Sequence, residues 1–456
     1  MKYFLTSLIL IFVITACDNS IDENENNVNN TNNINNTNNA NNINNINNIN
    51  NINNVNNVNN VNNSNNTNNI NNSNNTNNVN PETNTKVDLL FVIDNSLSME
   101  NEQANLINNF NLMVQSLNEE GGELPDIHVG ITSTDLGASP YNIPGCPTSG
   151  GDNGLLLKGI DNSCINPSGQ NYIVDVKPQG CNISQDEEGE TCLSHDCLVA
   201  NCDIAGEPDG LQLYLDENGC PRCRNYADET LPEVFSCNAD LGIQGCGFEQ
   251  PLEALKLTFD GSNQENLGFY RSGAKFAVVI ISDEDDCSAA SNEIFSTEQN
   301  EIGSTLGPLS SFRCTEFGVV CDEDWNRLVP GGEKLMHNCI SRPQSDYSSL
   351  LHPISRYINF LTTSPTGPGY SLDSITAAAL AGPFTGNLSV VLNQVDIPAV
   401  ASSCISAETG DGAIPAVRIK EFVSALTPSN QTPLFHSICE ENYGPSLELF
   451  AQKILQ

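Results

Sequence analysis

Residues 87–93 read Val87-Asp88-Leu89-Leu90-Phe91-Val92-Ile93, and the chain continues as Asp94-Asn95-Ser96-Leu97-Ser98-Met99. The first segment is almost continuously apolar, which is typical of a strand buried on both faces of a parallel sheet. The residues that follow place Leu106, Phe110 and Leu117 on one face of a helix. The Asp-x-Ser-x-Ser motif therefore lies where a central strand gives way to a helix. In open α/β sheets, ligands bind at such strand ends.

Strand and helix patterns alternate along the rest of the chain. Apolar segments at 275–282, 374–381 and 434–439 are typical of further strands. Segments at 352–361, 416–426 and 447–455 are typical of helices. This alternation predicts an α/β fold with a doubly wound, mostly parallel sheet, in a domain that spans residues 81–456.

The Asp94-x-Ser96-x-Ser98 motif, in this setting, resembles the metal-ion-dependent adhesion site of von Willebrand factor A (vWA) domains. The resemblance implies that these three residues hold Mg²⁺ or Ca²⁺ and that the metal captures an acidic group of a partner. The residue types suit this chemistry, because Mg²⁺ takes about six oxygen ligands and keeps several waters. Serine hydroxyls supply oxygen atoms without cancelling the charge of the metal.

The resemblance implies two further ligand positions. One is an aspartate after the next central strand, 275–282, and here it is Asp283. The other usually holds threonine, and counting back from Ala254-Leu255 places Glu249 there. A carboxylate at this position would weaken the pull on an anionic partner, or it would favour Ca²⁺. Alternatively, Glu249 is a helix-start residue stabilised by the helix dipole.

Several polar residues adjoin these positions. Thr134 and Asp135 end a segment, 127–135, that resembles the second strand of the family and would open onto the same face. Asp285 and Asp286 follow Asp283 and either support the site or lie in a solvated loop, which we favour for Asp286. His128, inside the 127–135 segment, is expected to be structural.

The first residues predict export and lipid anchoring. An apolar run at 4–15 leads to Ile14-Thr15-Ala16-Cys17, which resembles the lipobox of bacterial lipoproteins. The resemblance implies a lipid on Cys17 and a place in the cell envelope, at the outer membrane or cell surface rather than the inner membrane. An ordinary secretory signal is the alternative. Residues 18–80 are an Asn-rich low-complexity segment, for which we expect a flexible tether, with a stacked fibrous assembly as the alternative.

Charge and cysteine content narrow the class further. The chain has 17 basic and 56 acidic residues, a formal charge of −39, so we expect no nucleic-acid binding. All cysteines except Cys17 lie between Cys146 and Cys439, and in an exported chain they favour disulfides. Most fall in two insertions, at about 140–240 and 287–345. We expect the insertions to lack cores of their own, to be held by disulfides and to lie near the metal-bearing face.

The first insertion contains a second recognisable pattern. Cys192, Cys197 and Cys202 are followed by Asp216-Glu217-Asn218-Gly219-Cys220-Pro221-Arg222-Cys223, which together resemble the antistasin-type inhibitor repeat. The resemblance implies a reactive segment near Arg222, although Asn225 stands where that family has another cysteine. Zinc binding by Cys220 and Cys223 with His195 is an alternative, but an oxidising compartment favours disulfides.

These observations favour a binding protein rather than an enzyme. The sequence has no His-Glu-x-x-His, Gly-x-Ser-x-Gly or phosphate-loop motif. We expect a protein or polymer partner with an acidic group, together with attachment to a membrane through the lipid. Two alternatives stay open: a protease inhibitor acting through the first insertion, and a structural envelope scaffold in which a metal only stiffens the vWA-like domain.

Overall fold

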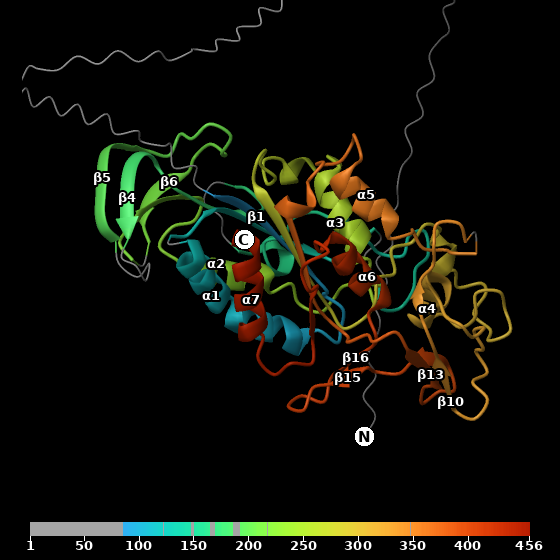
Figure 1. Ribbon diagram of the computed structural model, residues 1–456. Helices are drawn as coiled ribbons and strands as arrows, with labels where there is room; N and C mark the ends of the chain where they lie inside the picture. The colour runs from blue at the N-terminus through green and yellow to red at the C-terminus, as the bar shows by residue number, and fades with distance from the viewer. Residues whose placement is uncertain are drawn as a thin grey trace, which may run out of the picture. The chain divides into compact units, whose positions relative to one another are not determined.

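The computed structural model describes residues 85–456 apart from residues 122, 147–149, 165–168, 186–191, 217 and 347. The expected lipidation site Cys17 and the Asn-rich segment 18–80 lie outside the described residues. The described part is an α/β structure in which helices cover both faces of one large sheet (Figure 1). None of the helices in this part is long and apolar enough to cross a membrane.

The large sheet has eight strands within the described residues. In spatial order they are β17 (Leu434–Ser437), β12 (Ile375–Ala381), β8 (Lys275–Ser282), β1 (Lys86–Ile93), β2 (Asp126–Ser133), β3 (Ile173–Val176), β7 (Pro221–Arg224) and β6 (Gln212–Leu215). The five strands from β17 to β2 pair in parallel. The other three extend the β2 edge by antiparallel pairing, so the sheet is mixed. The predicted α/β class is confirmed.

Seven α-helices occur in the described part of the chain. They are α1 (Glu100–Gly121), α2 (Leu231–Ala239), α3 (Pro251–Phe259), α4 (Phe312–Gly318), α5 (Ser355–Thr362), α6 (Val417–Leu426) and α7 (Gly444–Leu455). One face of the sheet is covered by α1, α2 and α7, and the other by α3, α5 and α6 (Figure 1). Helix α7 begins at Gly444, three residues before the predicted start. Its second residue is a proline, whose fixed φ suits the first turn of a helix and whose missing N–H is not needed there.

Strand β1 lies at the centre of both hydrophobic cores. Leu89 and Phe91 contribute to the core beneath α1, whereas Leu90 and Val92 contribute to the core beneath α3. Phe91 packs edge-on against Phe235 with ring centroids 4.8 Å apart. Burial of each such side chain contributes roughly 1.5–3 kcal/mol, which explains why the strand is apolar on both faces.

The first insertion differs from the prediction. It is not held by disulfides alone, because it supplies β3, β7 and β6, and its Tyr172 and Val174 lie in the main core. It also contains a hairpin of β4 (Gln179–Gln185) and β5 (Cys192–Asn201). Its disulfides include Cys164–Cys237 and Cys202–Cys223. The insertion therefore widens the main sheet at the β2 edge.

The second insertion also has more of a core than predicted. Phe312, Val319 and Met336 pack with Leu388 and Val390 of a strand that follows the insertion. The small sheets involved are β10 (Glu333–Met336) with β13 (Leu388–Leu392) and β14 (Pro398–Val400), and β9 (Val319–Val320) with β11 (Ile340–Ser341).

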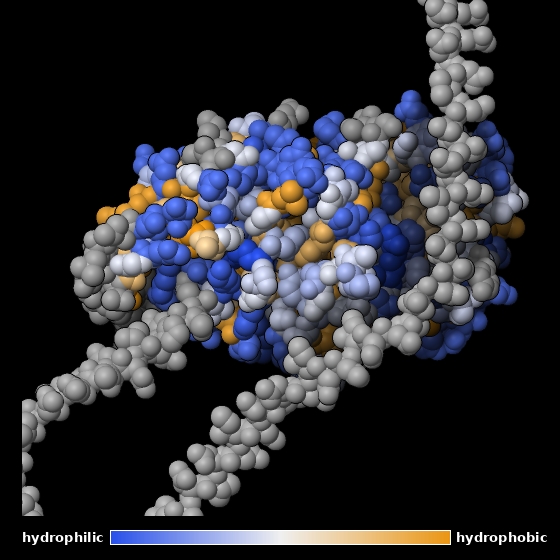
Figure 2. Space-filling view, turned by 90° about the horizontal axis from the view of Figure 1, so that it is seen from above, coloured by the Kyte–Doolittle hydropathy of each residue, from blue (hydrophilic) through white to orange (hydrophobic). Residues whose placement is uncertain are grey.

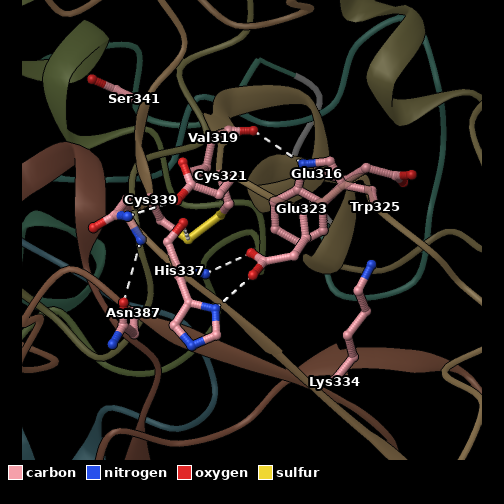
Figure 3. The surroundings of a disulfide bond; sticks show 12 residues. Glu316, Val319, Cys321, Glu323, Trp325, Lys334, His337, Cys339, Ser341 and Asn387 are labelled. Carbon is pink, nitrogen blue, oxygen red and sulfur yellow. Dashed lines mark hydrogen bonds and ion pairs between the residues drawn. A yellow bond between two sulfur atoms is a disulfide. The ribbon is translucent and has the colours of Figure 1, made fainter.

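A disulfide completes this small lobe. Cys321 and Cys339 are bonded, and both Nδ1 and the backbone N–H of the neighbouring His337 contact the Glu323 carboxylate at 2.5 and 2.7 Å (Figure 3). The Trp325 indole N–H donates to the Val319 carbonyl at 3.2 Å (Figure 3). Apolar packing and covalent bonding therefore hold the lobe together.

The surface agrees with the acidic composition. Figure 2 shows hydrophilic residues over most of the face seen from above, with hydrophobic residues in separate patches. On the edge strand β6, Leu213 and Leu215 are exposed.

A buried ion network ties the first insertion to the opposite end of the sheet from Asp94. Glu207, which precedes β6, contacts His128 Nε2 at 2.6 Å and Arg271 Nη1 at 3.2 Å. Arg271 Nε also pairs with Asp88 at 2.8 Å. Burial raises the pKa of Glu207, but the hydrogen bond from His128 and the charges of His128 and Arg271 outweigh burial, so this pKa lies below its ordinary value of 4.5. His128 is structural, as expected, and much of the insertion lies away from the Asp94 end.

We expect Glu207→Gln to lower the free energy of unfolding by about 3 kcal/mol at pH 7, because it removes the buried carboxylate that contacts both His128 and Arg271 and leaves Asp88 as the carboxylate paired with Arg271. Because the pKa of Glu207 is lowered in the folded state, its contribution is present above pH 4.5 and is lost as the pH falls through the folded-state value. Urea denaturation between pH 3 and pH 7 should therefore show the two proteins converging in acid. The exposed Glu333→Gln is the control, and a constant difference at all pH values would contradict this assignment.

Candidate metal centre

Asp94 and Asp283 follow two neighbouring strands at the same edge of the sheet. Strands β1 and β8 are parallel with Ile93 opposite Ile281, and the Asp94 N–H donates to the Ile281 carbonyl at 2.9 Å. Strand β2, which follows β1 in the chain, pairs with β1 on the side away from β8. Strand β12, which follows β8, pairs with β8 on the side away from β1. The winding of the sheet therefore reverses between β1 and β8, and ligands of open α/β sheets bind at such points.

Two hydrogen bonds hold the buried Asp94 carboxylate in one orientation. Oδ1 accepts from the Ser96 N–H at 2.8 Å, and Oδ2 accepts from the Ser282 hydroxyl at 2.8 Å. The Ser282 Oγ also accepts from the Glu284 N–H at 3.2 Å, which fixes the loop after β8. The sequence analysis did not select Ser282. The feature of the sequence that could have identified Ser282 is a hydroxyl at the last position of a strand that is apolar from Phe276 to Ile281.

The two motif serines connect Asp94 to Asp283. The Ser96 and Ser98 hydroxyl oxygens are 3.4 Å apart, and the Ser98 side chain hydrogen-bonds to Asp283. Oδ1 of Asp283 is buried without a hydrogen-bond partner among the described residues. The structure therefore brings together four of the predicted site residues.

Electrostatics make this group of residues suitable for a cation. Burial, with the neighbouring Asp283 carboxylate, raises the pKa of Asp94 to about 8, and burial raises the pKa of Asp283 as well. A divalent cation would offset both negative charges and would satisfy the free Asp283 oxygen. Within the described part of the chain, no three Asp, Glu, His or Cys side chains lie close enough together to hold a metal ion by themselves. A cation here would therefore depend on the serine hydroxyls as well as on the two carboxylates.

Glu249 lies at the edge of this group and faces another carboxyl group. It is buried, and it precedes Gln250, the N-cap of α3, so it lies outside the helix whose dipole was the alternative explanation for it. Burial and the nearby Glu284 and Asp94 carboxylates raise the pKa of Glu249 well above its ordinary value. One proton between the two carboxyl groups allows Glu249 to hydrogen-bond to Glu284, whose own pKa burial raises to about 7. Glu284 is a neighbour that the sequence analysis missed.

Asp285 and Asp286 are buried and face away from the serines, so the solvated loop expected for Asp286 is wrong. Asp285 accepts from the Arg418 and Ile419 N–H groups at 3.0 and 3.2 Å and thereby caps α6. Asp286 pairs with the Arg418 guanidinium at 2.8 and 3.0 Å and accepts from the Leu252 N–H of α3 at 3.1 Å. Both aspartates thus fix the helices that surround the site.

Thr134 and Asp135 follow β2 beside β1. The Thr134 N–H donates to the Ile93 carbonyl at 3.2 Å, and its buried hydroxyl has no hydrogen-bond partner among the described residues. The Asp135 carboxylate instead accepts from the Gly137 N–H at 2.7 Å, so it organises its own loop. Of these two possible neighbours, Thr134 is the one with a buried polar side-chain atom that has no hydrogen-bond partner among the described residues.

Disulfides join both insertions to the loops around the site. Cys146–Cys246 connects the start of the first insertion to the segment that precedes Glu249. Cys287–Cys314 anchors the second insertion four residues after Asp283. These are the parts of the insertions that lie near the site.

The alternatives based on Cys220 and Cys223 gain no support. Cys223 is bonded to Cys202 and Cys220 is also disulfide-bonded, so neither thiolate is available for zinc. Arg222 is only 3% exposed and pairs with Asp175 at 2.5 Å. Because an inhibitor must present its reactive segment to the protease, the burial of Arg222 does not favour the inhibitor alternative.

Comparison of the chain with protein-family models, with curated proteins and with solved structures finds no match.

We expect Asp286→Asn to lower the free energy of unfolding by at least about 3 kcal/mol, because the fully buried Arg418 guanidinium would lose the carboxylate with which it pairs at 2.8 Å. Urea denaturation at pH 7 measures this loss, and the exposed Asp373→Asn is a control with the same chemical change. A loss within about 0.5 kcal/mol of the control would be typical of a surface position and would contradict the buried pair.

Proposed function

We propose that this protein is a cell-envelope lipoprotein, anchored through Cys17, whose vWA-like domain binds Mg²⁺ or Ca²⁺ and captures a partner through the cation. Asp94, Ser96, Ser98 and Asp283 are the proposed ligands. The observation that carries the proposal is the buried, unpartnered Asp283 oxygen beside Asp94 and two hydroxyls, at the point where the winding of the sheet reverses. The domain acts in binding rather than catalysis.

The proposed coordination leaves room for an external group. The four side chains offer about four of the roughly six oxygen atoms that Mg²⁺ requires, so water or a carboxylate of the partner fills the rest. The site is accessible on the side of the motif loop, because Ser98 is exposed and Leu97 is 75% exposed. Leu97 gives a partner an apolar contact next to its acidic group.

The charge balance favours an acidic group. The Asp94 and Asp283 carboxylates together balance the charge of a divalent cation, and the proton shared in the Glu249–Glu284 hydrogen bond removes part of the negative charge of that neighbouring pair. The two ligand carboxylates therefore do not outweigh the attraction of the cation for an acidic group of a protein or polymer. At physiological salt, where the screening length is about 8 Å, exposed acidic residues farther than this from the cation repel a partner only weakly.

We expect Ser96→Ala/Ser98→Ala to lower cation affinity at least tenfold, equivalent to about 1.4 kcal/mol, because the change removes two oxygen ligands and keeps both carboxylates. Calorimetric titration of Mg²⁺ and Ca²⁺ into the detergent-solubilised full chain measures the change. The matched control is Ser371→Ala/Ser374→Ala, which removes two exposed hydroxyls that are 2.8 Å apart elsewhere in the fold. Identical titration curves for all three proteins would remove the metal site.

The same proteins test the capture step. A glutamate-rich peptide should bind the cation-loaded wild type and should be released by a chelator. Cation binding without retention of the peptide would contradict capture and would favour the structural scaffold instead.

We expect Glu249→Gln to leave cation affinity within about threefold of wild type, because the amide can donate to Glu284 as the protonated carboxyl group does. Asp283→Asn is the comparison, and we expect it to cost at least tenfold. Calorimetry under the same conditions gives both values. An equal loss in the two variants would make Glu249 a direct ligand.

A further inference from the structure

A polar cavity is lined by residues other than the proposed metal ligands. It is bounded by α1, by the hairpin of β15 (Cys404–Ile405) and β16 (Gly412–Ala413), and by the loop from β17 to α7. Its volume is about 300 Å³. The α1 wall carries Glu102 and Asn105, the hairpin contributes Glu408, and the loop contributes Glu440 and Glu441.

The walls of this cavity are fixed to one another. The Cys404–Cys439 disulfide joins the hairpin to the loop. The Asn105 side chain of α1 donates to the Glu440 carbonyl at 3.0 Å. The Glu441 carboxylate accepts from the N–H groups of residues 407 and 408 at 2.7 and 3.0 Å. The cavity is therefore formed before any ligand enters.

The lining is acidic, and His436, which does not line the cavity, lies 3.9 Å from the Glu440 carboxylate. Glu102, Glu408, Glu440 and Glu441 line it, whereas no Lys, Arg or His is among the described residues that do so. Glu440 and Glu441 accept hydrogen bonds from the protein. Glu102 differs, because it is only 7% exposed and its Oε2 has no hydrogen-bond partner among the described residues. Burial of an unsatisfied carboxylate oxygen is unfavourable, and a positively charged donor would offset its cost.

The dimensions favour an organic cation over a metal ion. A volume of about 300 Å³ corresponds to the space of roughly ten water molecules. In the described part of the chain, no three acidic, His or Cys side chains are close enough to hold a metal ion. An ammonium group has three N–H donors, and the carboxylate and amide oxygens of the lining are acceptors for them.

We propose that this cavity is a second binding site, for an organic ammonium group carried by a polyamine or by a lysine side chain of a partner, with Glu102 as its principal acceptor. The site uses none of the proposed metal ligands, and the charge of the nearby Asp283 carboxylate acts on Glu102 without a direct contact between them. It gives the domain a means of selecting ligands by positive charge and hydrogen-bond donors, in addition to any acidic group that a cation captures.

Calorimetry on the full chain in a chelator and about 0.15 M salt tests the site, with spermidine and an end-blocked trilysine peptide as separate probes. We expect saturable one-to-one binding of at least one probe and a loss of at least tenfold in Glu102→Gln. Glu120→Gln, an exposed change of the same kind at the far end of α1, should bind like wild type. Glu408→Gln, on an exposed wall residue, should weaken binding several-fold and covers the case in which Glu102→Gln fails to fold.

The outcomes separate the two sites and the two sources of ligand. Binding of spermidine alone identifies a polyamine, and binding of the peptide alone identifies a lysine side chain. Ser96→Ala/Ser98→Ala should bind either probe like wild type, so failure of the metal centre leaves this result intact. Absence of binding, equal effects of Glu102→Gln and Glu120→Gln, or equal binding of tetramethylammonium, which has no N–H donor, would each overturn the proposal.

Discussion

The parallel pairing of β1 with β8 is the constraint on which the rest of this structure depends. The two strands end in register, so the residues after them, Asp94 and Asp283, meet at one edge of the sheet. Helices cover both faces of these strands, and that coverage removes water from the two carboxylates. The same burial that stabilises the core therefore creates a pair of aspartates that needs positive charge.

The four consecutive acidic residues after β8, at positions 283–286, each have different partners. Asp283 faces the motif serines and Glu284 meets Glu249. Asp285 caps α6, and Asp286 pairs with the buried Arg418 while it also accepts from the first turn of α3. A single loop thus connects the site to both helices behind it, so the position of Asp283 depends on contacts that lie outside the site.

The sequence was sufficient to predict the elements that are long and strongly apolar. Strands β1 and β8 and helix α1 have clear patterns, and the residue types at the strand ends pointed to Asp94 and Asp283. The burial of Asp286 could not be predicted, because its partner Arg418 is 132 residues away along the chain and meets it only after folding. Strands β3, β6 and β7 have four residues each, too few for a reliable period, and cysteine spacing cannot define pairings.

The Cys146–Cys246 bond spans 100 residues and closes directly beneath the loop that carries Glu249. A protease that cut once inside this long segment would leave both parts of the chain joined through this bond. The groups around Asp94 would keep their places, because no fragment could diffuse away. Because Cys146 and Cys246 stay covalently joined, a single cut between them does not divide the chain into two pieces.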